Sequence, residues 1–490
     1  MTPTRSDVAV TDVVVVDTPF GPVRGVRDDA RGVVRFGGVP YAQAARFGLP
    51  EATSWSEPVD ATRPGAAPPQ VAEEPALVPG MVPARQDEAC LTVEVCVPAG
   101  ALDGGATPPV LLWVPGGGYR TGGAALPTYD GASLAQQQAV VVGVNYRLGA
   151  AGWLAADGVP SNLGLRDLMA AVAWVRAAAP AFAGDPARIV AFGESAGAGL
   201  LAHLLATPDG ATGLAGAVLA SGAPAGTLDA ATAAWVGERL LEAAGVRDVD
   251  GLRTLGIEEL LAAQEVAALA ASREVGRMPF HPWVDGDLVA AAPVHAALAP
   301  VPLVVGTTAH EMELFRAEVP ALPDDVALGF LARKAAVLGI TDEAAVAAGY
   351  DACDRDLVEA VADLDLHLPN GLLAVAHARH GNPVWRYRFT WESPAHGACH
   401  ALDLPFWFGT LDVAGWEQFA GAQGADADAL SVRMRDALAS FAATGTPVDG
   451  LTGPWPTNAL VHLGGTRRTG PDAVSERVGA WLGRPGTDGS

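Results

Sequence analysis

Lysine is almost absent from this chain, which has only one, Lys334, among its 490 residues. Arginine supplies nearly all of the 31 basic residues, and 55 acidic residues leave a formal net charge of −24. A surface of this sign repels the phosphate backbone of nucleic acids and anionic lipid headgroups. The charge balance therefore argues against nucleic acid and membrane surfaces as partners.

Long apolar runs and cysteines are scarce as well. Charged residues, glycine and proline interrupt every apolar run before it reaches the roughly 18 residues that cross a bilayer. No apolar segment follows a basic start at the N-terminus, so we expect no secretory signal and a cytoplasmic location. Four cysteines without a C-x-x-C pair predict free thiols, because they are too few for a disulfide framework and lack the spacing of a zinc site.

The segment 188–206 combines a buried strand, a tight turn and a helix around one serine. An apolar run ends at Phe192, Gly193-Glu-Ser195-Ala-Gly197 follows, and an apolar helical run starts at once. A turn this tight strains the backbone of Ser195 and requires small residues two positions to either side. The hydroxyl then stands at a helix N-terminus, which favours developing negative charge. The pattern predicts a nucleophile elbow. A glycine-rich turn between strand and helix with an incidental serine would have the same sequence and is the alternative interpretation.

Strand and helix signals alternate around this elbow. Apolar segments at 109–114, 139–144 and 217–220 have the composition of buried strands, and 165–178 has the spacing of a crossover helix. This alternation predicts an α/β fold with a large, mostly parallel sheet and helices on both faces. Further strands are expected at 13–16 and 32–36, joined by a turn, and at 91–97, 302–306 and 384–391, with an amphipathic helix at 431–443.

We interpret residues 1–490 as one domain. Residues 229–275 are rich in alanine, leucine and glutamate and predict a helical, cap-like insertion, because no flexible linker brackets them. Residues 483–490 have the composition of a loose tail.

A serine nucleophile needs a base, and the base needs an acid that holds its tautomer. In α/β-hydrolases the base comes last along the chain, where His396 and His400 both qualify, whereas His203 falls on an apolar helical face and is expected in the core. Glu311 follows the apolar run that ends at Gly306, on the side where α/β sheets place their sites. A first-turn acid that stabilises the next helix would occupy the same place.

Seven short motifs follow one another over roughly residues 12–460: Phe36-Gly-Gly-Val-Pro-Tyr-Ala42, Asn145-Tyr-Arg-Leu-Gly149, Asn162-Leu-Gly-Leu-Arg-Asp167, Phe182-Ala-Gly-Asp-Pro186, Phe192-Gly-Glu-Ser-Ala-Gly197, Gly306-Thr-Thr-Ala-His-Glu311 and His400-Ala-Leu-Asp-Leu-Pro-Phe-Trp-Phe-Gly409. In this order they resemble the motifs of the type B carboxylesterases, the family of bacterial para-nitrobenzyl esterases, animal liver carboxylesterases and cholinesterases.

The resemblance implies an α/β-hydrolase fold and hydrolysis of carboxylic esters through an acyl-enzyme. It places the nucleophile on Ser195, the acid on Glu311 and the base on His400, because only His400 is followed by Ala-Leu-Asp-Leu-Pro-Phe. It places the oxyanion hole on the N–H groups of Gly117, Gly118 and Ala196. It also implies a small-molecule ester as substrate and neither cofactor nor metal, and it leaves a monomer or a homodimer open.

Three departures from the family pattern affect these expectations. Pro115 stands where the family usually has histidine or tyrosine, and Met312 replaces the glycine after the acid, so the acid loop is expected to differ in backbone there. Cys90 is kept, but residues 65–70 contain no partner cysteine, so the first family disulfide is not expected. An inactive relative used for binding would have lost triad residues, which this chain keeps. Cleavage of amides, carbamates or thioesters by the same machinery stays open.

Overall fold

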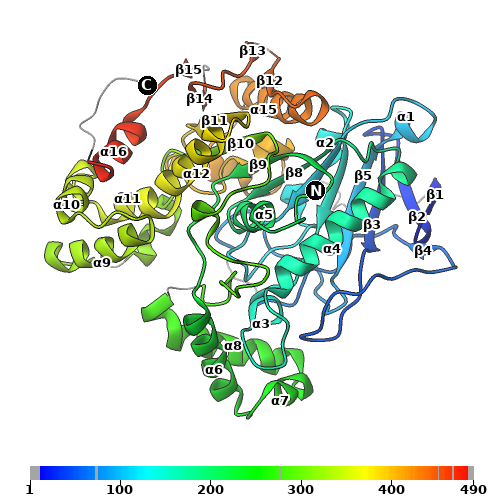
Figure 1. Cartoon of the computed structure of the whole chain (residues 1–490). Coiled ribbons are helices and arrows are strands. Elements are labelled where there is room, and N and C mark those ends of the chain that lie inside the picture. Colours follow the sequence, from blue (N-terminus) through cyan, green and yellow to red (C-terminus); the bar gives the residue numbers. More distant parts are fainter. Residues whose placement is uncertain are drawn as a thin grey trace.

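A sheet of mixed strand direction forms the middle of the molecule (Figure 1). The computed structural model describes residues 12–71, 76–275, 278–319, 321–422, 424–450, 452–465 and 468–483. The strands are β1 (Val13–Thr18), β2 (Gly21–Asp28), β3 (Val33–Pro40), β4 (Val59–Asp60), β5 (Thr92–Pro98), β6 (Val110–Val114), β7 (Val140–Val144), β8 (Ile189–Glu194), β9 (Leu214–Ala220), β10 (Leu303–Thr308), β11 (Val384–Phe389), β12 (Val448–Asp449), β13 (Gly453–Pro454), β14 (Leu460–Leu463) and β15 (Arg468–Thr469).

Helices lie in each connection from β5 to β12. The α-helices are α1 (Ala99–Leu102), α2 (Ala132–Ala135), α3 (Gly149–Trp153), α4 (Leu163–Ala178), α5 (Ala196–Ala206), α6 (Ala230–Ala244), α7 (Val249–Thr254), α8 (Ile257–Val275), α9 (Asp324–Val337), α10 (Glu343–Ala352), α11 (Leu357–Ala362), α12 (Leu368–Arg379), α13 (Leu404–Phe408), α14 (Trp416–Ala420), α15 (Ala425–Thr444) and α16 (Ala473–Trp481). Shorter helical turns are η1 (Pro127–Tyr129), η2 (Ala179–Phe182), η3 (Pro293–His295), η4 (Glu313–Glu318) and the π-helical η5 (Asp363–His367).

The large sheet has the strand order β1-β2-β3-β5-β7-β6-β8-β9-β10-β11-β14-β15, and β4 pairs with β2. Pairing is parallel from β7 through β6, β8, β9, β10 and β11 to β14. It is antiparallel between β7 and the β1 edge and again between β14 and β15. The mostly parallel sheet predicted from the sequence is confirmed. The carboxyl ends of the parallel strands share one edge, where the loops after β8, β10 and β11 meet.

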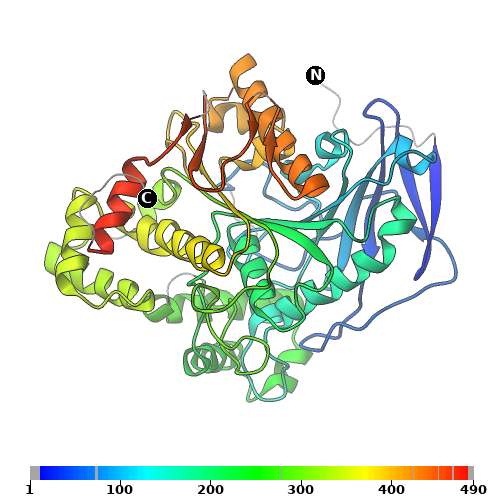
Figure 2. The ribbon, with the colours of Figure 1, turned by 45° about the horizontal axis from the view of Figure 1, so that its top comes forward.

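Helices cover both faces of the sheet because its central strands carry apolar side chains on both sides. In β6, Leu112 packs in one buried cluster with Leu168 of α4 and Leu200 of α5, whereas the neighbouring Trp113 packs in another with Met434 of α15. Figure 2 accordingly shows the teal α4 and the orange α15 on opposite sides of the sheet. The predicted covering of both faces is confirmed.

Two helical segments extend from this core. The helices α6, α7 and α8 occupy the stretch 229–275, as predicted, and are the green helices at the bottom of Figure 1. A second group, α9 to α12 over 324–379, was not predicted. Its buried cluster combines Leu331, Val346 and Leu364 with Trp481 of α16, so this segment has an apolar core of its own.

The N-terminal edge of the sheet differs from its prediction. The strands expected at 13–16 and 32–36 are not joined by a turn, because β2 lies between them and pairs with both. Val23 and Gly25 are the buried residues of β2, whereas Arg24 is exposed. A strand that buries only one face and carries charged residues has no continuous apolar run, so its sequence resembles that of a turn.

The remaining sequence predictions concern the cysteines, membrane-spanning helices, the C-terminal tail and the number of domains. All four cysteines are free and buried, which confirms the expected thiols, and burial raises the pKa of Cys90 and Cys96 to about 12. No helix within the described ranges is long and apolar enough to span a membrane. Of the predicted tail 483–490, only Gly483 lies inside the described residues. The assignment of 1–490 to a single domain stays a prediction.

Candidate active site

Ser195 lies between the end of β8 and the start of α5, at the carboxyl edge of the sheet. Its backbone has φ 54° and ψ −125°, and a positive φ is strained for a residue other than glycine. Gly193 and Gly197 fit this turn because they lack side chains. A Cβ atom on Gly193 would lie 2.6 Å from the carbonyl carbon of Gly197, and one on Gly197 would lie 2.0 Å from the carbonyl oxygen of Val114. The predicted strained turn is confirmed.

Glu311 and His400, which are 89 residues apart in sequence, meet at this edge. Glu311 follows β10 and His400 lies in the loop between β11 and α13. Oε2 of Glu311 lies 2.7 Å from Nδ1 of His400, and its Oε1 accepts a hydrogen bond of 2.8 Å from the backbone N–H of Thr308. The carboxylate is completely buried. Both of its oxygens are therefore engaged, and the imidazole is held by its Nδ1.

The other nitrogen of His400 faces the residue that precedes Ser195. Nε2 lies 3.3 Å from Oε1 of Glu194, a buried carboxylate that ends β8. Within the described part of the chain, no hydrogen bond joins Oγ of Ser195 to His400. The structure thus brings Glu194, Glu311 and His400 together beside the elbow. Glu194 was not among the predicted site residues, although it stands inside the elbow motif.

The ionisation of these groups is coupled by their burial. Burial raises the pKa of Glu194 to about 8 against the opposing charge of His400. Burial by itself lowers the pKa of His400, but Glu194 and Glu311 outweigh it and raise that pKa to about 9. Burial likewise favours neutral Glu311, yet the hydrogen bond from His400 lowers the pKa of Glu311 below its usual value. A carboxylate at Glu311 and a readily protonated imidazole are the ionisation states that this arrangement favours.

The rival acid and base have other partners. Oδ2 of Asp403 accepts hydrogen bonds from the hydroxyl of Tyr387 at 3.2 Å and the indole of Trp407 at 3.1 Å, and burial raises its pKa to about 6. The ring of His396 packs near that of Phe419, with 5.6 Å between the ring centroids. His400, not His396, is therefore the histidine beside Glu311.

The remaining histidines near the elbow have structural contacts. His203 is buried, with Nδ1 2.8 Å from the carbonyl oxygen of Gly199, and burial lowers its pKa to about 4. It is the core residue that the sequence predicts. His310 accepts a hydrogen bond of 3.0 Å from the backbone N–H of Ala398. This bond ties the loop of Glu311 to the loop of His400, a contact that the sequence position of His310 did not suggest.

The loop after β6 lies against the elbow from the other side. A Cβ atom on Gly116 would lie 2.7 Å from the backbone oxygen of Glu194. Gly117 has φ +111° and Gly118 has φ +61°, and within the described residues neither N–H donates to a protein acceptor. Ala196 is the first residue of α5, so its N–H has no acceptor within the helix. These three N–H groups are free to bind an anionic oxygen.

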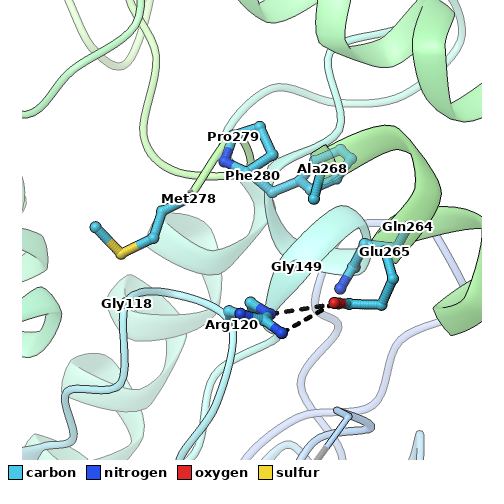
Figure 3. A pocket seen from close by; sticks show the side chains of 9 residues that line it. All are labelled: Gly118, Arg120, Gly149, Gln264, Glu265, Ala268, Met278, Pro279 and Phe280. Atoms are coloured by element: carbon cyan, nitrogen blue, oxygen red, sulfur yellow. Dashed lines mark hydrogen bonds and ion pairs between the residues drawn. The ribbon is translucent and has the colours of Figure 1, made fainter. Parts of the chain in front are cut away.

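A small cavity adjoins this loop (Figure 3). Figure 3 shows the ion pair of Arg120 and Glu265 on one side and Met278 and Phe280 on the other. The residues that line the cavity are Gly118, Arg120, Gly149, Gln264, Glu265, Ala268, Met278, Pro279 and Phe280. A second cavity lies beside Pro115, Gly122 and Tyr146. Among the described residues, no group of three or more histidine, cysteine, aspartate or glutamate side chains could hold a metal ion.

Comparison with known proteins identifies the family. The model of the carboxylesterase family matches residues 12–326 and 332–462. The chain belongs to the carboxylesterase family. A para-nitrobenzyl esterase of Bacillus subtilis (strain 168) is 35% identical over 480 residues, which cover 88% of this chain and 90% of that protein. A fumonisin B1 esterase of Sphingopyxis macrogoltabida is 34% identical over 480 residues, with 90% and 83% covered.

A solved structure of a thermophilic PNB esterase has a TM-score of 0.84 and 31% identity to this carboxylesterase, and the match covers 95% of this chain and 99% of that one. The predicted resemblance to the family, the α/β-hydrolase fold and the assignment as an enzyme of the carboxylesterase class are confirmed.

Proposed function

We propose that this carboxylesterase hydrolyses carboxylic esters of small molecules through an acyl-enzyme formed on Ser195. The observation that carries the proposal is the contact of 2.7 Å between Glu311 and His400 beside a strained serine turn. A hydrogen-bonded carboxylate fixes the imidazole tautomer that leaves Nε2 able to accept a proton. The nearest charged neighbour of Nε2, Glu194, lies at 3.3 Å, which is longer than a strong charge-assisted bond, so Nε2 can turn to the serine hydroxyl when substrate binds.

The reaction then has two halves. Oγ of Ser195 attacks the ester carbonyl carbon while Nε2 of His400 takes the hydroxyl proton, and the carbonyl oxygen becomes an oxyanion. The C–O bond to the alcohol breaks, and the alcohol leaves with the proton from His400. Water next attacks the acyl carbon and gives its proton to His400. The bond to Ser195 breaks, the acid leaves, and Ser195 regains its proton.

The N–H groups of Gly117, Gly118 and Ala196 stabilise the oxyanion in both halves. Backbone donors that are held in place before the reaction need no rearrangement when charge develops. Glu311 stabilises the imidazolium that forms when His400 holds the proton. In this proposal the backbone N–H groups stabilise the negative charge and the Glu311 carboxylate stabilises the positive charge.

Labelling with a fluorophosphonate tests the proposal, together with turnover of p-nitrophenyl esters of increasing acyl length beside an anilide. We expect covalent label on Ser195 and loss of about 10⁶-fold in kcat for Ser195→Ala, because the rest of the machinery acts on that hydroxyl. Label on Ser221, which is completely buried, or undiminished turnover by the variant would contradict it.

We also propose that residues 1–490 act as one α/β-hydrolase domain with the cap-like helices 229–275.

The anilide in the same assay separates ester hydrolysis from amide hydrolysis. A cytoplasmic location and a monomeric or homodimeric state stay predictions.

A further inference from the structure

Two neighbouring residues of α8 contact the segments that hold the loop after β6. Gln264 is 4% exposed, and its Oε1 accepts a hydrogen bond of 2.8 Å from the backbone N–H of Ala150. Glu265 forms an ion pair with Arg120, with distances of 2.9 Å from Nη2 to Oε2 and 3.3 Å from Nε to Oε1. Both contacts join the cap-like helices to segments next to the central sheet, close to the proposed oxyanion hole (Figure 3).

The contact of Gln264 reaches the loop through Gly149. The N–H of Gly149 donates a hydrogen bond of 2.8 Å to the carbonyl oxygen of Tyr119, the residue after Gly118. Gly149 has φ +55°, and a Cβ atom there would lie 2.1 Å from Oε1 of Gln264. The absence of a side chain at Gly149 therefore leaves the space that the Gln264 amide fills.

The contact of Glu265 reaches the same loop through Arg120. The backbone N–H of Arg120 donates a hydrogen bond of 3.1 Å to the carbonyl oxygen of Gly117, which closes a turn around Gly118. The guanidinium of Arg120 is held on α8 by the two-point ion pair with Glu265. Two adjacent residues at the end of the segment 117–120 are thus tied to α8, Tyr119 through Gly149 and Ala150, and Arg120 through its ion pair with Glu265.

We propose that Gln264 and Glu265 are positioning residues that hold the turn 117–120 in the conformation whose N–H groups stabilise the oxyanion. This inference rests on the proposed function, because it assigns a support to the proposed oxyanion hole. An oxyanion hole acts through donors held in place before the reaction, so a small displacement of the turn costs transition-state stabilisation more than substrate binding.

Two substitutions of Gln264 separate positioning from general stability. Gln264→Leu leaves the buried N–H of Ala150 without an acceptor, whereas Gln264→Glu keeps an acceptor at the same place. We expect Gln264→Leu to lower kcat/KM about tenfold or more, mainly through kcat. Its affinity for a trifluoromethyl ketone, whose adduct with Ser195 places a negative oxygen in the hole, should fall in parallel. Gln264→Glu should stay within about threefold of the wild type in both measurements.

A second pair of variants tests the ion pair. Glu265→Gln should lower kcat/KM and trifluoromethyl ketone affinity about threefold with little change in KM. Glu242→Gln is the matched control, because Glu242 pairs with Arg239 at 2.6 Å on the neighbouring α6, away from the loop. It should leave both quantities unchanged. If Gln264→Leu does not fold, this pair still decides the inference.

Three results would overturn the inference. Folded Gln264→Leu could keep its ketone affinity, Gln264→Leu and Gln264→Glu could lose activity equally, or Glu265→Gln could behave like Glu242→Gln. In each case the wild type would still be labelled on Ser195 by the fluorophosphonate. Failure of that wild-type labelling would instead contradict the proposed function itself.

Discussion

The two sides of the candidate site are built from different groups. The proposed acid–base side consists of buried ionisable side chains, with His400 2.7 Å from Glu311 and 3.3 Å from Glu194. The proposed oxyanion side consists of backbone N–H groups, those of Gly117 and Gly118 in a turn with positive φ and that of Ala196 at the start of α5. The first side is specified by charge and hydrogen bonding between side chains. The second is specified by backbone conformation, which only a residue without Cβ adopts at low cost.

Because of this difference, each side of the site should respond to a different kind of amino-acid substitution. Replacing a charged group by a neutral one of the same shape should impair the acid–base side and leave the backbone in place. Adding a single Cβ atom should impair the oxyanion side with no change of charge. Isosteric and glycine-to-alanine substitutions therefore test the two sides independently.

Among the substitutions that compare the two sides, Glu311→Gln should have the largest effect. The amide cannot stabilise the imidazolium and favours the wrong tautomer of His400, so kcat should fall by about 10⁴-fold with little change in KM. Asp403→Asn is the matched control, because an amide oxygen can still accept from Tyr387 and Trp407. Steady-state kinetics of both variants tests which carboxylate is the acid. A large loss of kcat in Asp403→Asn with a small loss in Glu311→Gln would reverse the assignment.

Gly117→Ala should have the next largest effect. The new Cβ atom would lie 2.1 Å from the backbone oxygen of Thr121, so the turn must move. We expect a loss of about 10² to 10³ in kcat, comparable to removal of one oxyanion donor. Gly158→Ala is the control, since Gly158 also has positive φ but nothing lies within 4 Å of the added atom. Equal kcat losses in the two variants would show that backbone strain, and not the oxyanion hole, is responsible.

A smaller effect is expected from Glu194→Gln, and it should appear in the pH profile. Loss of the negative charge near Nε2 makes protonation of His400 less favourable and lowers the pKa of that imidazole. Because the base must be neutral to act, the acid limb of kcat/KM should move to lower pH, by about one unit. Glu94→Gln is the control, because Glu94 is a half-buried carboxylate with a pKa of about 7 that accepts hydrogen bonds from the N–H groups of Gly38 and Gly65. Its acid limb should not move, and an unmoved limb in Glu194→Gln would be the contrary result.

Pro115→His should have the smallest effect. Proline lacks an N–H, but the proposed donors come from other residues, and the carbonyl oxygen of Pro115 accepts a hydrogen bond of 2.8 Å from the hydroxyl of Tyr146. That bond does not depend on the side chain at 115, and the cavity beside Pro115 adjoins the place of the new ring. We expect kcat/KM to change within about tenfold. A gain of several hundredfold would mean that the oxyanion hole is impaired by the native proline.

The predictability of the site varied with how local each signal was. Ser195 is apparent from one continuous segment, because its strained turn needs Gly193 and Gly197 within two positions. Reasoning from residue types alone left His396 and His400 open, and the family motif Ala-Leu-Asp-Leu-Pro-Phe, which follows only His400, favoured that histidine. The structure places His400 against Glu311. Glu194 escaped prediction because a residue between Gly193 and Ser195 satisfies the turn whatever its side chain, and its contact with His400 exists only in the folded chain.

Sequence by itself determined the alternating apolar strands, the crossover helix, the elbow and the helical character of 229–275, because each follows from backbone periodicity within a short window. It did not reveal β2, whose single buried face lacks an apolar run, or the helices of 324–379. The tertiary structure alone decided that Glu194 faces His400, that His310 ties the loops of Glu311 and His400 together, and that Gln264 and Glu265 reach the loop after β6. These contacts join residues from separate elements, so they depend on how the helices and loops pack around the sheet and leave no local pattern.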